Sequence, residues 1–213
     1  MKVDIFDFDL PKDLIAIRPA EPRDTAKLLH VQDDSFANYQ IRDLLNLLGP
    51  NDVLVLNDTK VIPAQLFGYR DQVKIAATLH KMVSDDSWWA FAKPGKRLKI
   101  DDTIVFGANL FAKVINKDEH FGVLLEFNAK GENLYNQLEK YGVMPLPPYI
   151  ERESGADTKD ADDYQTVFAK NVGAVASPTA GLHFTPELLN KLEQKGVKIV
   201  FVTLHVGAGT FLP

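Results

Sequence analysis

Residues 173–205 read GAVASPTAGLHFTPELLNKLEQKGVKIVFVTLH, and this stretch decides the fold. The apolar run GAVA at its start predicts a short strand. The next segment has the signals of a helix, with Thr185 as the N-cap, Pro186 at the first helical position and Gly196 after the last turn. Residues 197–204 form a second apolar run, which predicts a buried strand. Strand, crossover helix and strand make a βαβ unit, whose right-handed crossover leaves the two strands parallel.

A third buried strand is predicted upstream, at residues 53–56, where VLVL is followed by polar residues. Ligands of open α/β sheets bind outside the carboxyl ends of parallel strands. Three polar loops, NDTK, PTAGLH and HVGAGT, fall at such ends. If the strands share one sheet, the loops converge on one rim and bring together Asn57, Asp58, Thr179, His183 and His205. Glycines in the same loops let backbone N–H groups approach a ligand closely, namely Gly181, Gly207 and Gly209.

The middle of the chain has a different sequence pattern. Between residues 66 and 127, short β-rich runs alternate with turn signals, which predicts a small antiparallel β-barrel. We therefore expect an α/β domain formed by residues 1–65 and 128–213, with the barrel domain inserted at 66–127. Residues 144–163 are expected to be irregular because they are rich in Pro and charge. The following stretch, YQTVFAKN at residues 164–171, is expected to be a short helix.

Composition narrows the function classes. The 213 residues carry a formal net charge of -5 and contain no Cys, which removes disulfides, thiolate catalysis and Cys-based zinc sites. No run of about 20 apolar residues is present that would cross a membrane. The N-terminus lacks the basic-then-apolar order of a secretory signal, so we expect a cytoplasmic protein with no membrane partner. The negative charge argues against nucleic-acid binding over the whole surface, but it allows a local basic patch.

Each candidate residue also has a structural interpretation. A histidine is more often a hydrogen-bonded structural residue than a catalyst, but two at the same kind of strand end leave both roles open for His183 and His205. His30, His80 and His120 lie in strand-like regions and are interpreted as structural. Asp58 is as well suited to capping a turn as to catalysis.

Several motif classes are absent or incomplete. No metal site is expected, because there is no HExxH motif and no local cluster of His and carboxylates with ligand spacing. GAG at residues 207–209 is only a fragment of a dinucleotide fingerprint. Neither a P-loop nor a G-x-S-x-G elbow occurs, which discounts an unrelated nucleotide-binding protein or hydrolase.

Four cations stand close together in KPGKRLK, on a predicted hairpin of the barrel: Lys93, Lys96, Arg97 and Lys99. Such a cluster is either a solvated turn or the local surface that meets a phosphate backbone.

Six motifs, taken together, resemble those of one known family. In chain order they are FDFDLPKDLIAIRPAEPRDTAKLL, DVLVLNDTKVIPAQLFG, KPGKRLK, MPLPPYI, DDYQTVFAKNVGAVASPTAGLHFT and VTLHVGAGTF. They run from the first residues to the last, and they are similar to those of the S-adenosylmethionine:tRNA ribosyltransferase-isomerases of queuosine biosynthesis. The resemblance implies an α/β domain with an inserted β-barrel, in agreement with the pattern of strands and helices.

The resemblance also implies a reaction. The ribose moiety of S-adenosylmethionine is transferred and isomerised onto the aminomethyl group of 7-aminomethyl-7-deazaguanine in tRNA, giving epoxyqueuosine and releasing adenine and methionine. The base acted on lies at the wobble position of tRNAs with GUN anticodons. S-adenosylmethionine is then a co-substrate, no cofactor or metal is expected, and the protein is expected to be a monomer.

This chemistry needs a base that removes the acidic proton beside the sulfonium, an acid that assists adenine departure, and a neutral amine as nucleophile. The side chains suited to catalysis are His183, His205, Asp58 and Asp24. The residues expected to bind substrate are Asn57, Thr59, Thr179, Gly181, Gly207, Gly209, Arg18 and Arg23. The basic cluster of Lys93, Lys96, Arg97 and Lys99 is expected to bind tRNA.

The chain departs from the family pattern in places. It has Lys27 and Lys60 where Arg is usual, and Gln65 in place of another Arg, which weakens a phosphate or carboxylate contact at that edge. Family members also continue past Pro213, so the last part of the α/β domain is expected to be absent. Two function classes therefore stay open: an enzyme of the family, or a truncated, non-catalytic remnant that retains at most tRNA or nucleoside binding.

Overall fold

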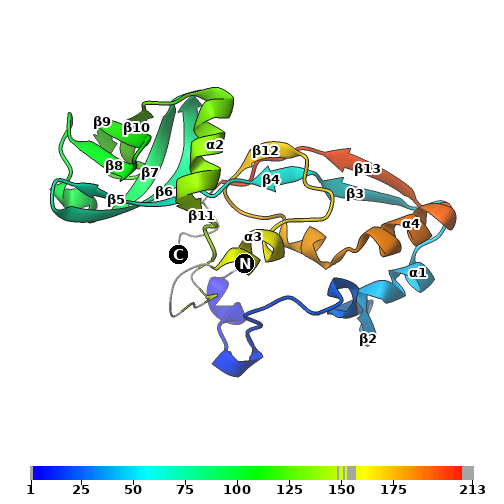
Figure 1. The fold of residues 1–213 in the computed structure, drawn as a ribbon. Coiled ribbons are helices and arrows are strands. Elements are labelled where there is room, and N and C mark those ends of the chain that lie inside the picture. Colours follow the sequence, from blue (N-terminus) through cyan, green and yellow to red (C-terminus); the bar gives the residue numbers. More distant parts are fainter. Residues whose placement is uncertain (1, 148, 151, 153–156, 208–213) are drawn as a thin grey trace.

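The computed structural model describes residues 2–147, 149–150, 152 and 157–207. Two parts lie side by side in Figure 1, a β-barrel and an elongated α/β part with parallel strand pairs and helices. This confirms the predicted fold class.

The barrel is a closed antiparallel sheet. Its strands pair in the order β5-β6-β7-β10-β9-β8, and β5 also pairs with β8. The bounds are β5 (Gln65–Arg70), β6 (Val73–Ser84), β7 (Ser87–Lys93), β8 (Thr103–Gly107), β9 (Leu110–Asp118) and β10 (Gly122–Phe127), with η5 (Gly95–Arg97) after β7. Inward residues alternate with outward ones along these strands, as a half-buried strand requires.

Closure of the barrel depends on Gly68 in β5. A Cβ atom at this position would lie 2.4 Å from the backbone oxygen of Val105 in β8. The neighbouring residue, Tyr69, pairs with Val105 and joins the two strands. Because no side chain fits in this space, glycine allows the close approach that closes the barrel.

Helix α2 (Gly131–Tyr141) packs against the barrel (Figure 1). Its buried Leu134 and Leu138 belong to the same apolar cluster as the inward-facing barrel residues. The helix is followed by β11 (Gly142–Val143), which pairs antiparallel with the start of β5. Together α2 and β11 connect the barrel to the α/β part.

The α/β part is built on one extended segment. β3 (Val53–Asn57) and β4 (Thr59–Val61) follow each other with only Asp58 between them. β13 (Lys198–Val202) runs parallel to β3, and β12 (Asn171–Ala174) runs parallel to β4. The parallel strands of the predicted βαβ unit are confirmed, but each pairs with a different half of this segment and not with the other.

This arrangement offsets β12 from β13 by one strand length. The backbone N–H of Asp58 donates to Val202 O at the end of β13, and Asp58 O accepts from the backbone N–H of Asn171 at the start of β12. The carboxyl end of β13 therefore meets the amino end of β12. Beyond β13 the chain continues beside β12, where Val206 O accepts from the backbone N–H groups of Val175 and Ala176.

The crossover consists of η6 (Thr179–His183) and α4 (Pro186–Gln194). Thr185 caps α4, since its Oγ1 accepts a hydrogen bond of 3.2 Å from Leu188 N. Leu188 and Leu192 are buried in a cluster with Leu56 of β3. Helix α4 thus covers one face of the β3–β13 pair, as the predicted crossover helix should.

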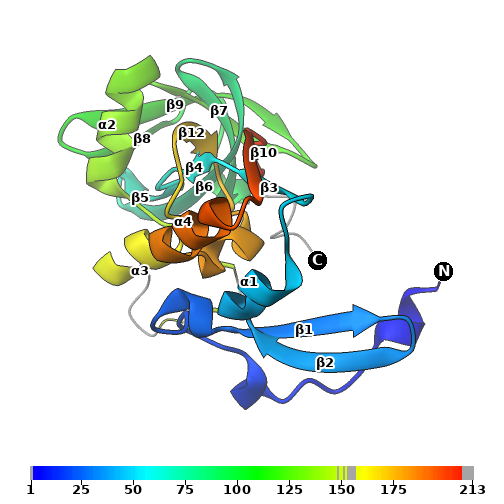
Figure 2. The ribbon, with the colours of Figure 1, turned by 90° about the vertical axis from the view of Figure 1, so that its right-hand side faces the viewer.

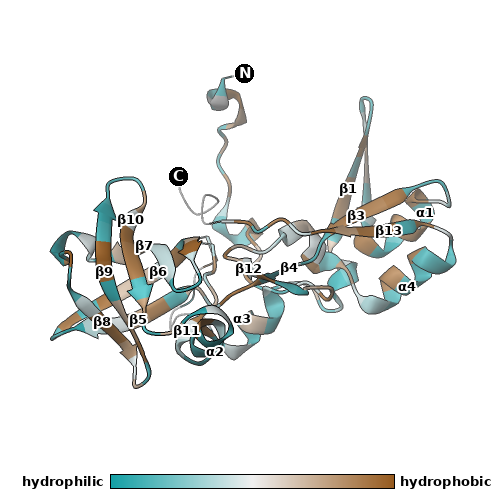
Figure 3. Cartoon of the chain, turned by 90° about the horizontal axis from the view of Figure 1, so that it is seen from above, coloured by the Kyte–Doolittle hydropathy of each residue, from teal (hydrophilic) through white to brown (hydrophobic). Residues whose placement is uncertain are grey.

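The opposite face of the β3–β13 pair is apolar and open. Val53, Val55 and Val202 are exposed on it, whereas Leu54 and Leu56 point to the α4 side. Figure 3 views this region from above, with β3 and β13 largely brown.

The N-terminal region lies along the α/β part. It contains η1 (Val3–Phe6), η2 (Lys12–Leu14), η3 (Arg23–Thr25), β1 (Lys27–Gln32), β2 (Ser35–Gln40), η4 (Ile41–Asp43) and α1 (Leu44–Leu47). β1 and β2 form an antiparallel hairpin that extends away from the core in Figure 2.

The prediction of a helix at residues 164–171 is wrong. The helix lies earlier, at α3 (Thr158–Asp163), inside the stretch expected to be irregular. Asp157 caps it by accepting a hydrogen bond from Asp160 N. The later residues are used for tertiary contacts instead, because the Gln165 side chain bonds both the N–H and the C=O of Val61. Two tertiary hydrogen bonds here override the local helical pattern.

Candidate active site

A triangle of polar side chains marks the junction of the two parallel strand pairs. Asp58 accepts hydrogen bonds from Thr203 Oγ1 at 2.6 Å and from Asn171 Nδ2 at 3.0 Å. Asn171 Nδ2 also donates to Thr203 Oγ1 at 2.9 Å. These hydrogen bonds lower the pKa of Asp58, that from Thr203 having the larger effect. A carboxylate stabilised in its ionised form is a weaker proton acceptor and suits a positioning role.

Asn57 holds the loop that follows β13. Its side chain accepts a hydrogen bond of 3.0 Å from Leu204 N and donates one of 2.9 Å to Leu204 O. Both polar atoms of the amide are thus committed to the backbone one residue before His205. The predicted approach of Asn57 and Asp58 to the HVGAGT loop is found, with a role for both in fixing that loop.

His205 is held by Thr59 and Gly173. Its Nδ1 lies 2.8 Å from Thr59 Oγ1, and Thr59 is fully buried. A Cβ atom on Gly173, whose φ is +149°, would lie 2.9–3.0 Å from three atoms of the His205 ring. Glycine therefore lets the imidazole lie directly on the backbone of β12, although His205 as a whole residue is exposed.

A cavity of about 620 Å³ opens between the barrel and this part of the α/β region. Gly173, His205 and Gly207 line it from the α/β side. The barrel side contributes His80, Lys81, Met82, Trp88, Phe91, His120, Phe121 and the α2 residue Tyr135. Its volume falls within the range of small-molecule sites, about 300–1,000 Å³, and its walls are mostly apolar and aromatic, as such sites usually are.

On the barrel side, the aromatic rings that line this cavity contact one another. The His80 ring stacks on Phe91 with centroids 4.1 Å apart and an interplanar angle of 12°. His80 Nε2 lies 2.9 Å from Phe121 O, and because a carbonyl oxygen only accepts, the proton of a neutral His80 sits on Nε2. Burial lowers the pKa of His80. The sequence interpretation of His80 and His120 as purely structural thus missed that both face a cavity.

His183 does not share this cavity. It lines a second one, of about 210 Å³, together with Thr179, Arg18 and Tyr164. Burial, and then the positive charge of Arg23, lower the pKa of His183. The structure therefore does not bring His183 and His205 to one rim. The reason is the offset of β12, because the loop after β12 lies one strand length beyond the loop after β13.

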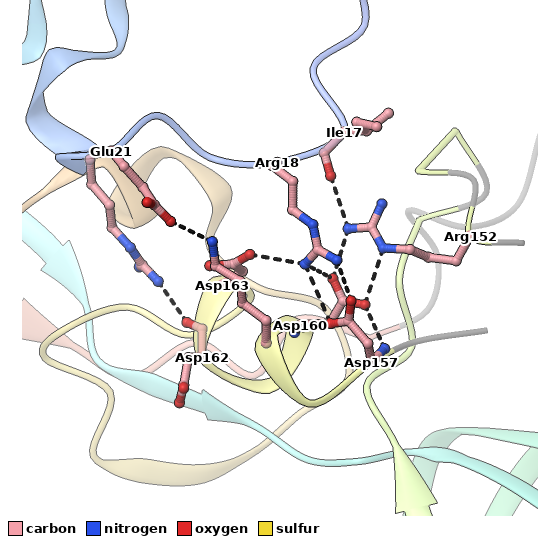
Figure 4. A network of polar contacts seen from close by, with 10 residues as sticks. Ile17, Arg18, Glu21, Arg152, Asp157, Asp160, Asp162 and Asp163 are labelled. Atoms are coloured by element: carbon pink, nitrogen blue, oxygen red, sulfur yellow. Dashed lines mark hydrogen bonds and ion pairs between the residues drawn. The ribbon is translucent and has the colours of Figure 1, made fainter. Parts of the chain in front are cut away.

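Arg18 is committed to a carboxylate cluster on α3 (Figure 4). Its Nη1 lies 2.8 Å from Asp160 and 3.1 Å from Asp163, and its Nη2 pairs with Asp157. Asp160 is only 1% exposed and also pairs with Arg152 at 2.7 Å. The guanidinium expected to bind substrate thus ties the N-terminal region to α3.

Arg23 and Asp24 also have protein partners. Arg23 donates to the backbone oxygens of Asp162 and Gln165 at 2.6 and 2.7 Å. Asp24 lies 3.4 Å from Arg42. The structure places none of Arg18, Arg23 and Asp24 in the larger cavity. Gly181 is buried against Phe168 and Thr166, and Gly209 lies outside the described residues.

The basic cluster Lys93, Lys96, Arg97 and Lys99 lies at the end of β7 and on the turn that follows it. All four side chains are exposed, and none forms an ion pair with another residue in the described part of the chain. Lys117 Nζ stabilises this turn by donating a hydrogen bond of 2.6 Å to Leu98 O. β7 is also the strand that supplies Phe91 to the larger cavity, so the cluster begins two residues from that wall.

Sequence reasoning missed Gly173, Asn171, Thr203 and the aromatic barrel wall. Asn171 begins β12 and Thr203 follows β13, so each is a polar residue at the edge of an apolar run, and this is the one signal by which they stand out. Gly173 and His80 carry no such signal, since their roles depend on which strand lies beside them. Among the described residues, no group of three His or acidic side chains is arranged to hold a metal ion, and no helix has the length and apolarity to cross a membrane.

Comparison with known proteins gives the family. The profile of the family described as "Queuosine biosynthesis protein" matches residues 3–213. The S-adenosylmethionine:tRNA ribosyltransferase-isomerase of Maricaulis maris is 52% identical over 222 residues, which cover 100% of this chain and 63% of that protein. The protein of the same name from Rhodospirillum rubrum is 52% identical over 213 residues, covering 100% of this chain and 61% of the relative.

A crystal structure of S-adenosylmethionine tRNA ribosyltransferase from Thermotoga maritima is 30% identical, covering 94% of this chain and 58% of that one, with a TM-score of 0.37. The chain thus spans about three fifths of the length of these curated relatives, 61–63%. By the match over residues 3–213, this chain belongs to the queuosine biosynthesis protein family.

Proposed function

We propose that the chain carries the ribosyl-transfer site of an S-adenosylmethionine-dependent tRNA ribosyltransferase-isomerase. In this reaction the ribose moiety of S-adenosylmethionine is transferred and isomerised onto the 7-aminomethyl group of a 7-deazaguanine in tRNA. The products are epoxyqueuosine-tRNA, adenine and methionine. The observation that carries the proposal is the cavity of about 620 Å³ between barrel and α/β part, where an exposed histidine faces an aromatic wall.

The cavity suits a nucleoside. Aromatic and apolar side chains supply stacking surface for a purine, which is worth about 1–3 kcal/mol per stacked base. The small residue Gly207 on the other wall leaves the backbone accessible to a ribose or a carboxylate. His205 lies on this wall, opposite the aromatic one, where a side chain that accepts a proton would reach the carbon beside the sulfonium.

We assign the proton-accepting role to His205 and a positioning role to Asp58. His205 is exposed to the cavity, whereas Asp58 is bound to Thr203 and Asn171. His183 is then a candidate for a different step or for a structural role, since it lines the smaller cavity with Thr179. Arg18 and Arg23 support the site by holding α3 and η6 through their protein contacts, and Asp24 pairs with Arg42 of η4.

The tRNA partner is proposed from the charge distribution. The base acted on lies at the wobble position of a GUN anticodon and must leave the loop to enter a pocket. The exposed cluster at Lys93, Lys96, Arg97 and Lys99 begins beside the cavity wall and forms no ion pair within the described chain, so it is available for phosphates.

We further propose that the protein is cytoplasmic and monomeric, and that residues 66–127 form the inserted barrel domain. Size-exclusion chromatography with light scattering tests whether it is a monomer.

The test is adenine release by the 213-residue chain. The purified protein is incubated with S-adenosylmethionine and a tRNA carrying 7-aminomethyl-7-deazaguanine, and adenine is quantified by chromatography. We expect release that depends on the tRNA and falls by about 100-fold or more in His205→Ala, the usual loss when a general base is removed. His183→Ala is measured beside it. Near-normal turnover in His205→Ala would contradict the role assigned to His205, and near-normal turnover in both variants would contradict the assignment of the site.

A second function remains testable in the same experiment. Because the chain spans only 61–63% of its curated relatives, a module that binds tRNA or nucleoside without turnover is the alternative. Binding of the tRNA by the unmodified chain without any adenine release would favour this alternative over the enzyme.

A further inference from the structure

Thr59 is buried behind His205 and has a single hydroxyl hydrogen to share between two partners. Its Oγ1 lies 2.8 Å from His205 Nδ1 and 3.4 Å from the backbone oxygen of Asn171. The residue is 0% exposed, so the hydroxyl has no access to bulk water. Thr59, expected from the sequence to bind substrate, therefore touches the catalytic candidate and not the cavity.

The two contacts decide where the His205 proton sits. Asn171 O only accepts, so the Thr59 hydroxyl must donate to it for that contact to be a hydrogen bond. Thr59 Oγ1 then has no further hydrogen and accepts from His205. Both contacts are made at once only when a neutral His205 carries its proton on Nδ1. In the opposite tautomer Thr59 donates its single hydrogen to His205, and the hydrogen bond to Asn171 O is lost.

We infer that Thr59 is a positioning residue that holds His205 as the Nδ1-protonated tautomer, with the lone pair of Nε2 directed to a substrate in the cavity. Nε2 has no hydrogen-bond partner among the described residues, and the exposed side of the ring lines the cavity. Gly173 supports this by letting the ring lie flat on β12, which fixes the plane in which Nε2 points.

The inference rests on the proposed function for its chemical meaning, since the reaction needs a base at this place. In the proton-transfer step, the bond between the ribose carbon beside the sulfonium and its hydrogen breaks. Its electrons stay on that carbon, and Nε2 takes the proton to give an imidazolium. Only a histidine with a bare Nε2 can do this, because an Nε2 that already carries hydrogen is a donor. The hydroxyl of Thr59 thus determines whether Nε2 of His205 accepts a proton or donates a hydrogen bond.

The test reads the tautomer directly. In protein labelled with 15N-histidine, the ring nitrogens are observed by NMR at pH 8.5, where an ordinary imidazole of pKa about 6.5 is neutral. His205→Gln identifies the His205 signals. We expect the proton on Nδ1 in the unmodified protein, a shift toward the Nε2-protonated form in Thr59→Val, and a return to the original pattern in Thr59→Ser.

A matched control is available in Thr166, a second buried threonine, 5% exposed, whose hydroxyl has no partner among the described residues. Thr166→Val removes a buried hydroxyl without touching His205 and should leave the His205 signals unchanged. Far-UV circular dichroism and thermal unfolding of each variant check that the fold is kept.

Adenine release gives the second readout. We expect Thr59→Val to lower kcat at least tenfold with the KM for S-adenosylmethionine unchanged within threefold, and Thr59→Ser to restore kcat. A His205 that carries its proton on Nε2 in the unmodified protein, or a tautomer that Thr59→Val leaves unchanged, would overturn the inference. The expected tautomer pattern without any adenine release would support the inference about Thr59 and count against the proposed function.

Discussion

Asp58 and Thr203 join the two parallel strand pairs, because Asp58 accepts a hydrogen bond of 2.6 Å from the Thr203 hydroxyl immediately after β13 ends. The same carboxylate accepts from Asn171 at the start of β12. One side chain thus holds the end of one strand to the beginning of another. The loop that carries His205 leaves from this point, so its position depends on an ionised Asp58.

The pH dependence of stability should reveal this role. Hydrogen bonds from Thr203 and then Asn171 lower the pKa of Asp58 below its ordinary value of 3.8. A group with a lowered folded-state pKa stabilises the fold above its unfolded pKa, and this contribution is lost as the pH falls through the folded pKa. We expect Asp58→Asn to destabilise the protein at pH 6, and we expect the difference from the unmodified protein to shrink below about pH 4.

Urea unfolding at pH 6 and at pH 3 measures both differences. Asp34→Asn, which replaces an exposed carboxylate with no hydrogen bond in the described part of the chain, is the control and should show no such change with pH. An Asp58→Asn difference that stayed constant over this range would refute the assigned role.

The two faces of β3 should respond differently to mutation. Leu56 is 6% exposed and packs in the cluster with α4, whereas Val55 is 57% exposed on the open face. We expect Leu56→Ala to lower the free energy of unfolding by about 2–5 kcal/mol, because it leaves a cavity. Val55→Thr should change it by about 0.5 kcal/mol or less. Urea unfolding compares the two, and a large loss in Val55→Thr would mean that this face is covered in solution.

The Arg18–Asp160 pair should be strongly coupled. Asp160 is 1% exposed, so an unpaired carboxylate there is costly, and Arg18 supplies one of its two guanidinium partners. We expect Arg18→Leu to destabilise the protein clearly and a double-mutant cycle with Asp160→Leu to give a favourable coupling free energy. Asp13→Asn, on the exposed N-terminal region, is a control for charge removal. Additive effects of Arg18→Leu and Asp160→Leu would show that the pair contributes nothing specific.

Gly173→Ala should disturb His205 without unfolding the protein. The added Cβ would lie 2.9–3.0 Å from the imidazole, and the φ of +149° is unfavourable for alanine. We expect adenine release to fall at least tenfold and the NMR signals of His205 to shift. Gly49→Ala places its Cβ 4.0 Å from its nearest neighbour and should leave both readouts unchanged. Unchanged release in Gly173→Ala would argue against a fixed imidazole.

The basic cluster should set the salt dependence of tRNA binding. Removal of one cation that binds a phosphate reduces the slope of log K against log salt by about 0.7–0.9. We therefore expect Lys96→Gln/Arg97→Gln to weaken binding and to reduce this slope by about 1.4–1.8. Lys191→Gln/Lys198→Gln removes the same charge from α4 and β13, at the far end of the molecule in Figure 1, and should leave the slope unchanged. Equal slopes for both double variants would contradict a specific tRNA surface at the cluster.

Local signals in the sequence were enough to predict several parts of the fold. Thr185, Pro186 and two apolar runs were enough to predict the crossover helix and its parallel strands, because capping and hydrophobic periodicity act within a few residues. The barrel followed in the same way from its alternating pattern. The helix expected at residues 164–171 failed where long-range contacts of Gln165 were stronger than the local pattern.

Only the tertiary structure decided which residues share a site. The sequence placed His183 and His205 at equivalent strand ends, but β12 pairs with β4 and β13 with β3, so the two loops open into different cavities. The same pairing buries Thr59 behind His205 and brings the His80 wall opposite to it. Strand partners are chosen by contacts between residues more than 100 positions apart, and no periodicity along the chain records that choice.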